Sequence, residues 1–277
     1  METEKRAAQS LHKEFGKTIY KRFTKALSDY EMIRAGDKIA VCISGGKDSM
    51  LLAVLFRDWV KHSPVPFEVT YLVMDPGYSA PNRALIEENA RKLDVPITVF
   101  ETDIFGSVVN VKNNPCFLCA KMRRGHLYNK AKELGCSKIA LGHHYDDVIE
   151  SILMGMIYGG QVQTMLPKLH SANFEGMQLI RPLYLVREEE IKRWRDVNDL
   201  RFLQCACRFT EQCAQCAPDD SISKRIEIKE LIAKLAAGNP QVESNIFRSV
   251  ENVRLDRIIS YKDRAGEVHS FLDGYED

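Results

Sequence analysis

The chain has 277 residues, of which 45% are hydrophobic and 28% charged, and its formal net charge is +1. A chain of this length buries enough apolar surface to fold without disulfides, and the composition is that of an ordinary soluble globular protein. No apolar run approaches the roughly 18–20 residues that cross a bilayer, and the charged N-terminal stretch lacks the apolar core of a signal peptide. We therefore expect a cytoplasmic protein without membrane contact, in which any basic surface for nucleic acid is local.

Apolar patterns predict strands that alternate with helices along most of the chain. Strands are expected at 38–44, 67–75, 96–102, 138–144 and 177–186. One or two helices are expected over 3–33 and single helices at 48–62, 81–94, 146–159, 187–200 and 222–236, with a loop leading into a further helix over 116–136. This alternation favours an α/β fold, a Rossmann-like and mostly parallel sheet with helices on both faces and helical additions at both ends.

The segment SGGKDS, residues 44–49, joins the first predicted strand to the next helix. Ligands of open α/β sheets sit at the carboxyl ends of the strands. Gly45 and Gly46 let the backbone approach a ligand, and the N–H groups at the helix start attract an anion. Lys47 adds charge, and the hydroxyls of Ser44 and Ser49 add donors. The spacing is neither that of a Walker P-loop nor GxGxxG. The loop therefore predicts a phosphate site, the alternative being a tight turn that uses glycine for its geometry alone.

SGGKDS after a first strand resembles the signature of the PP-loop ATP pyrophosphatases, and residues 44–49 match it in full. The resemblance implies a PP-loop fold whose loop, including Asp48, binds ATP and splits it into AMP and pyrophosphate while a substrate oxygen is adenylated. It suggests three parts, which are an N-terminal helical segment (1–35), a PP-loop ATP-binding catalytic domain (36–200) and a C-terminal segment with cysteines and a helix (201–277).

Eight cysteines are spaced unevenly: Cys116 and Cys119 form a CxxC, and four more crowd into residues 205–216. Cysteines of a cytosolic protein serve metal binding or catalysis more often than disulfides. A CxxC by itself can bind zinc, hold an iron–sulfur cluster, act in redox exchange or be incidental. Arg123, one helical turn after Cys119, would place positive charge beside a thiolate or phosphate, or simply belong to a solvated basic face.

The segment ALGHHYDDVIESILMGMIYGG, together with CxxCxxxRRG and the later PKL and IRPL, resembles the tRNA 2-thiocytidine synthetases, relatives of the tRNA 2-thiouridine synthetases. The resemblance spans about residues 36–205. It implies that sulfur replaces the C2 oxygen of a tRNA pyrimidine, cytidine 32. It also implies a [4Fe-4S] cluster held by Cys116, Cys119 and Cys205, with an open iron position for sulfide. Cys207 rivals Cys205, because this chain has Cys-Ala-Cys where the family has P-C-x-x-C.

Asp146 and Asp147 start a helix directly after the fourth predicted strand. The functional interpretation is that one carboxylate holds Mg²⁺ on the phosphates of ATP and the other orients or deprotonates the cytidine. The alternative is that they only cap the helix. At neighbouring strand ends, Gly142 and Met74 are expected to let adenine approach the backbone.

The interpretation that follows is an ATP-dependent tRNA sulfurtransferase. Its expected partners are tRNA, ATP and a sulfur donor such as a cysteine desulfurase or free sulfide, and the resemblance also suggests a homodimer. One alternative is a PP-loop thiolase that uses a persulfide on Cys205 or Cys207 and no cluster. Another is a zinc-stabilised RNA-binding module with a decayed nucleotide loop. A separate zinc site at Cys207, Cys213 and Cys216 also stays open.

Overall fold

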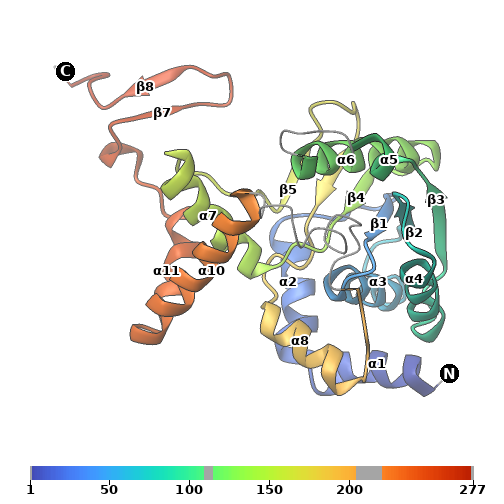
Figure 1. The fold of residues 1–277 in the computed structure, drawn as a ribbon. Helices are drawn as coiled ribbons and strands as arrows, with labels where there is room; N and C mark the ends of the chain where they lie inside the picture. Colours follow the sequence, from blue (N-terminus) through green and yellow to red (C-terminus); the bar gives the residue numbers. More distant parts are fainter. Residues whose placement is uncertain (1, 109–114, 204–219, 276–277) are drawn as a thin grey trace. The chain divides into compact units, whose positions relative to one another are not determined.

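The computed structural model describes residues 2–108, 115–203 and 220–275 (Figure 1). The chain forms two compact units, one of residues 1–148 with 165–224 and one of residues 149–164 with 225–277. Among the described residues, no helix is long and apolar enough to cross a membrane. The sequence-based boundaries at residues 35 and 200 stay a prediction.

The first unit contains a six-stranded sheet, which confirms the predicted α/β fold. Its strand order is β3 (Ile97–Glu101), β2 (Glu68–Asp75), β1 (Lys38–Ile43), β4 (Lys138–Ala140), β6 (Gln178–Ile180) and β5 (Lys168–His170). All neighbours pair in parallel except β5, which is antiparallel to β6 at one edge. The carboxyl ends of β1, β2 and β4 therefore open on one edge of the sheet.

In this sheet, two strand predictions were too long, and one strand was missed. The strand expected at 177–186 ends at Ile180, and Pro182, which cannot donate to a ladder, lies in the turn that follows. The strand expected at 138–144 ends at Ala140, because the chain bends there to begin the next helix. Edge strand β5 has only three residues, too few for a recognisable alternation.

Except for α5, which was not predicted, the helices of the first unit follow the predicted order. They are α1 (Glu2–Lys13), the π-helix η1 (Gly16–Tyr20), α2 (Lys21–Asp29), α3 (Lys47–Trp59), α4 (Ala80–Lys92), α5 (Ile104–Val108), α6 (Pro115–Glu133), α7 (Tyr145–Gly159), which continues into the second unit, and α8 (Glu188–Val197). The loop expected at the start of 116–136 is helical instead, because α6 begins at Pro115, which suits the first helical position.

Helix α3 is buried on nearly all sides, from Ser49 to Phe56. A helix that is hydrophobic all round must be covered on both faces. The sheet covers one face, and α1, η1, α2 and α8 supply a further helical layer, whose Phe15, Ile19 and Phe23 are fully buried in the same core (Figure 1). The N-terminal helices thus hold the helix on which the glycine loop is built.

The second unit contains α10 (Asp220–Gly238) for most of its length, α11 (Val242–Ser249), the short 3-10 helix η2 (Leu255–Arg257) and a hairpin of β7 (Ser260–Lys262) and β8 (Val268–Ser270). The late helix predicted at 222–236 is present within α10. The hairpin lies in the polar tail, where the sequence showed turn residues and little periodicity.

Candidate functional site

The loop Ser44–Ser49 joins β1 to α3 in a conformation that requires glycine. Gly45 has φ +86°, and a Cβ there would lie 2.7 Å from Cγ1 of Ile86 and 2.9 Å from Cδ1 of Leu203. Its carbonyl accepts a hydrogen bond from the backbone N–H of Leu203 at 3.1 Å. Gly46 is the N-cap of α3 in an extended conformation. The loop therefore exposes backbone to a ligand at the start of a buried helix.

The two serines of this loop have different roles. The Ser49 hydroxyl, 5% exposed, accepts from the Ser44 N–H at 3.1 Å and donates to the Gly46 carbonyl at 3.0 Å. It therefore stabilises the turn from inside. Ser44 is exposed, and its hydroxyl lies 3.1 Å from that of Ser49. Of the two predicted hydroxyl donors, Ser44 is the one that faces outward.

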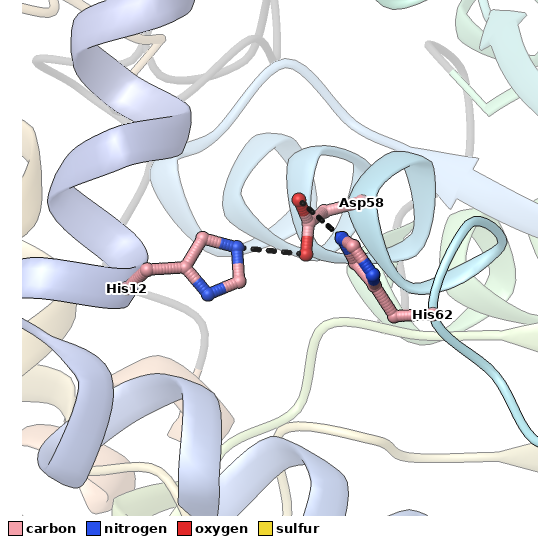
Figure 2. Close-up of side chains that lie close together, drawn as sticks. All are labelled: His12, Asp58 and His62. Atoms are coloured by element: carbon pink, nitrogen blue, oxygen red, sulfur yellow. Dashed lines mark hydrogen bonds and ion pairs between the residues drawn. The ribbon is translucent and has the colours of Figure 1, made fainter.

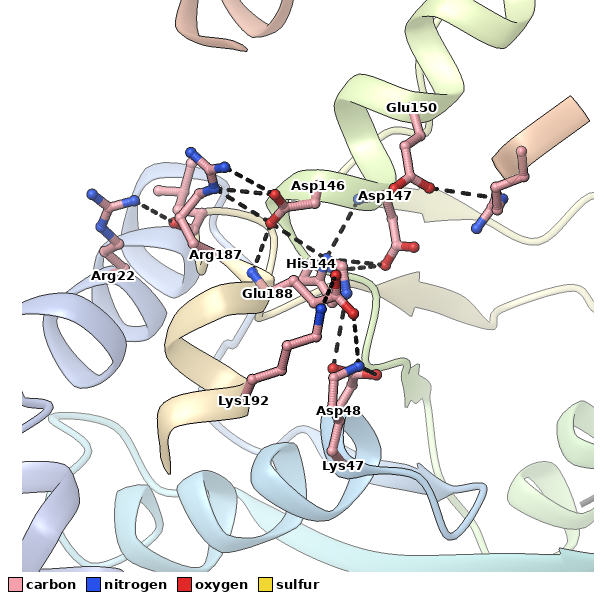
Figure 3. A network of polar contacts seen from close by, with 12 residues as sticks. Arg22, Lys47, Asp48, His144, Asp146, Asp147, Glu150, Arg187, Glu188 and Lys192 are labelled. Atoms are coloured by element: carbon pink, nitrogen blue, oxygen red, sulfur yellow. Dashed lines mark hydrogen bonds and ion pairs between the residues drawn. The ribbon is translucent and has the colours of Figure 1, made fainter. Parts of the chain in front are cut away.

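Lys47 lies between two carboxylates (Figure 3). Its Nζ is 3.1 Å from Oδ2 of Asp48 and 3.0 Å from Oε1 of Glu188, the first residue of α8. Burial alone would lower the pKa of Lys47, but the charges and hydrogen bonds of these carboxylates outweigh it, and the pKa of Lys47 is raised. The ammonium therefore stays charged at the loop.

Asp147 and His144 cap the start of α7 reciprocally. The His144 N–H donates to Oδ2 of Asp147 at 3.0 Å, and the Asp147 N–H donates to Nδ1 of His144 at 3.4 Å. This is the pattern of a capping box, with histidine in the place of serine or threonine. Asp147 therefore caps its helix, which was the alternative to a catalytic role. It also lines the cavity described below.

Asp146 points toward α8 rather than along its own helix (Figure 3). Its carboxylate accepts from the Glu188 N–H at 2.7 Å and pairs with Nη2 of Arg187 at 3.0 Å. It therefore caps α8 from a different segment of the chain. These contacts favour a positioning role for Asp146 over the catalytic role predicted with Asp147. Sequence reasoning missed Arg187 and Glu188, although an acidic run opening a helix is a usual N-terminal signal.

Asp48 carries a buried carboxylate oxygen. Its Oδ1 is inaccessible to solvent and has no hydrogen-bond partner among the described residues. Nε2 of His144 lies 3.8 Å from it. A buried, unsatisfied carboxylate oxygen beside a phosphate loop suits a hard cation such as Mg²⁺, which prefers oxygen ligands.

A cavity of about 330 Å³ brings together seven of the fourteen predicted site residues. It is lined by Cys42, Ile43, Ser44, Asp48, Ser49, Met74, Arg123, Leu127, Leu141, Gly142, His143 and Asp147. This volume is within the ~300–1,000 Å³ range of small-molecule sites. A Cβ on Gly142 would lie 3.1 Å from the Asp48 carbonyl carbon and from the Ser49 nitrogen, so Gly142 also lets two loops approach.

The glycine loop lies between this cavity and a larger one. Ser44 and Asp48 also line a cavity of about 1250 Å³, to which α8 contributes Lys192 and Arg195. Lys47 lines only the larger of the two cavities. The loop therefore presents polar groups to both sides.

The structure describes only part of the predicted cysteine site. Cys116 lies in the first turn of α6, and half-buried Cys119, one turn later, packs in the cluster of Met74 and Ile104. Arg123 donates to the Tyr78 hydroxyl at 3.3 Å and lines the smaller cavity. The side chain of Cys116 and all of Cys205, Cys207, Cys213 and Cys216 lie outside what the structure describes.

The cysteine that does line the cavity was not predicted to act there. Cys42 is 6% exposed on β1. Burial, with a smaller contribution from Cys136, raises the pKa of Cys42 to about 12. A protonated thiol is a poor nucleophile and a poor metal ligand. Cys42 is therefore a core residue that forms part of the cavity wall.

The sequence of this chain is similar to those of known PP-loop proteins. The PP-loop domain family matches residues 15–207. A tRNA-cytidine(32) 2-sulfurtransferase of Geotalea uraniireducens is 35% identical over 88% of this chain and 96% of its own length. One from Alkalilimnicola ehrlichii is 35% identical over 86% of this chain and 75% of its own length.

A solved structure shares the fold. The U34-tRNA thiolase NcsA from Methanococcus maripaludis, determined with its [4Fe-4S] cluster, aligns with a TM-score of 0.65 over 86% of this chain and 81% of its own, at 21% identity. At that identity the likeness concerns the fold alone.

Proposed function

Because this chain belongs to the tRNA-cytidine(32) 2-sulfurtransferase family of PP-loop enzymes, we propose that it uses ATP to replace the C2 oxygen of cytidine 32 in tRNA by sulfur. The observation that carries the proposal is the cavity in which the glycine loop, the start of α7 and the CxxC helix α6 meet. Adenylation and sulfur transfer need these three elements at one place.

ATP binding rests on the loop. Backbone N–H groups at the start of α3 and the charged Lys47 would hold the terminal phosphates. Mg²⁺ would be held by Asp48, whose Oδ1 has no hydrogen-bond partner among the described residues. The ion would neutralise phosphate charge. The buried Met74 and the close-packed Gly142 would form the adenine end of the site.

In the first chemical step, the C2 oxygen of the cytidine forms a bond to the α-phosphorus of ATP and the bond to pyrophosphate breaks. The base is left with an adenylated oxygen, and AMP becomes a good leaving group. Asp147 would orient the base or accept its proton. Arg123, held by the Tyr78 hydroxyl at 3.3 Å, would offset negative charge that develops on the phosphate.

The position of Cys116 and Cys119 on α6 fits a metal cluster. Cys116 lies in the first turn of α6 and Cys119 one turn later, and the helix dipole favours a thiolate at the first of these positions. With Cys205 as the third ligand they would hold a [4Fe-4S] cluster. When bound, the cluster would supply an iron position open to the sulfide that displaces AMP. Cys207 is the alternative third ligand.

A cysteine desulfurase or free sulfide would donate sulfur, the reaction would take place in the cytoplasm, and a homodimer is the expected assembly. Target nucleotides in anticodon loops are single-stranded, so the base can be turned into a pocket.

The test is ATP-dependent thiolation of tRNA by anaerobically purified protein, followed by nucleoside mass spectrometry. We expect 2-thiocytidine with the wild type and none with Cys116→Ala or Cys119→Ala, while Cys136→Ala, a buried core change outside the cavity, keeps activity. Iron and sulfide assays on the same samples address the cluster. Thiolation by iron-free protein would instead support the persulfide alternative, and no thiolation under any condition would overturn the proposal.

A further inference from the structure

Two histidines and an aspartate converge at the end of α3 that is remote from the nucleotide loop (Figure 2). His12 comes from the last turn of α1, Asp58 from the last turn of α3, and His62 from the turn that follows α3. The loop begins α3 at Lys47, eleven residues earlier, which is about 16 Å along the helix. The cluster is therefore separate from the proposed catalytic site.

The spacing of the three side chains suits ligands of a single ion. One ligand atom from each residue lies within 4.8 Å of the other two. Nε2 of His12 is 3.0 Å from Oδ2 of Asp58, and Nε2 of His62 is 3.8 Å from Oδ1. Atoms that each lie about 2.1 Å from one Zn²⁺ are separated by roughly 3.0–3.5 Å. A small rotation of the exposed His62 ring would bring it into that range.

A second layer of contacts holds the carboxylate. The Tyr20 hydroxyl donates a hydrogen bond to the Asp58 carboxylate. The Tyr20 ring also lies 4.4 Å from the His12 ring, between centroids. Asp58 is 14% exposed, against 43% for His12 and 55% for His62. Oriented ligands with an accessible open side are typical of sites that admit a metal from solvent.

We propose that His12, Asp58 and His62 bind a divalent transition cation of the Zn²⁺ class, with water completing its coordination. Imidazole nitrogen and carboxylate oxygen are the ligands such borderline cations prefer. The ion fastens α1 to α3 and thereby holds the N-terminal helical layer on the helix that begins with the nucleotide loop. The proposal does not depend on the thiolation activity.

Trp59 provides a reporter at this site. It follows Asp58 directly, and its ring centroid is 6.3 Å from that of Tyr20. The experiment titrates tag-free full-length protein with Ni²⁺ or Co²⁺, which quench nearby tryptophan, and follows fluorescence. We expect saturable quenching that Trp59→Phe removes. His12→Ala and His62→Ala should raise the apparent Kd at least ~10-fold, and Tyr20→Phe should raise it by about 10-fold.

His126→Ala removes an exposed histidine of α6 and should titrate as the wild type does. Thermal unfolding with Zn²⁺ is the second measurement. The ion should raise the Tm of the wild type more than that of His62→Ala, while any zinc on the cysteines affects both equally. Because His12 and His62 are exposed, their variants should fold. Wild-type quenching that persists in both variants, or an absence of saturable quenching, would overturn the proposal.

Discussion

Nζ of Lys47 lies 3.0 Å from Oε1 of Glu188 and so connects the nucleotide loop to the first turn of α8. The same carboxylate pairs through its other oxygen with Lys192 at 3.0 Å. The two lysines thus share one anionic partner, but only Lys47 belongs to the loop.

This arrangement predicts the effect of removing each lysine. Lys47→Met should weaken ATP binding by about 10- to 100-fold, because a charge-assisted hydrogen bond contributes roughly 1.5–3 kcal/mol. Glu188 keeps Lys192 as a partner, so the variant should fold normally. Lys192→Met is the matched control and should change ATP binding by less than about threefold. Isothermal titration with ATP and Mg²⁺ measures both, and equal losses in the two variants would contradict a direct role for Lys47.

Gly45 and Gly36 allow backbone strain to be separated from crowding. Both have positive φ, +86° and +81°, but a Cβ at Gly45 would collide with Ile86 and Leu203, whereas nothing lies within 4 Å of one at Gly36. Gly36→Ala should cost about 1–3 kcal/mol of unfolding free energy from strain alone. Gly45→Ala should cost more and should also weaken ATP binding. Urea unfolding and ATP titration test this, and equal unfolding losses would show that the collision at Gly45 is relieved without cost.

The Asp146 carboxylate is expected to stabilise the fold rather than to take part in the reaction. Asp146→Ala removes the cap of the Glu188 N–H and the ion pair with Arg187. We expect a loss of about 1–3 kcal/mol in unfolding free energy. Asp146→Asn keeps an oxygen acceptor and should lose less. An Asp146→Ala variant that unfolds like the wild type but is inactive would restore the catalytic role predicted from the sequence.

The buried thiol of Cys42 predicts that the free energy of unfolding falls at alkaline pH. Its thiol pKa is raised to about 12 by burial, so the unfolded chain releases this proton at lower pH than the folded one. The contribution of Cys42 to stability is therefore complete below the ordinary thiol pKa and is lost as the pH rises from there toward 12.

Two measurements check this behaviour. The free energy of unfolding should fall less steeply above about pH 9 in Cys42→Ala than in the wild type. Iodoacetamide at pH 8 should leave Cys42 unlabelled in the folded protein and label it after denaturation, as peptide mass spectrometry can show. Rapid labelling of folded protein at Cys42 would mean that the cavity thiol is more acidic than its burial indicates.

Features of this protein that depend on neighbouring residues are visible in its sequence. The glycine loop, the CxxC and the order of strands and helices are visible in the sequence because each depends on neighbouring residues and on the periods of helix and strand. The family match at residues 44–49 and in the segment from Ala140 follows from the same local order.

Only the tertiary structure decided which side chains meet. Asp146 caps a helix that begins 42 residues later, Gly142 packs against the backbone of Asp48 and Ser49, and His12 meets Asp58 from 46 residues away. No local pattern encodes such contacts, because they depend on how buried α3 packs between the sheet and the N-terminal helices. The residue types predicted to carry the chemistry were thus named from the sequence, whereas the partner of each carboxylate was determined by packing between distant elements.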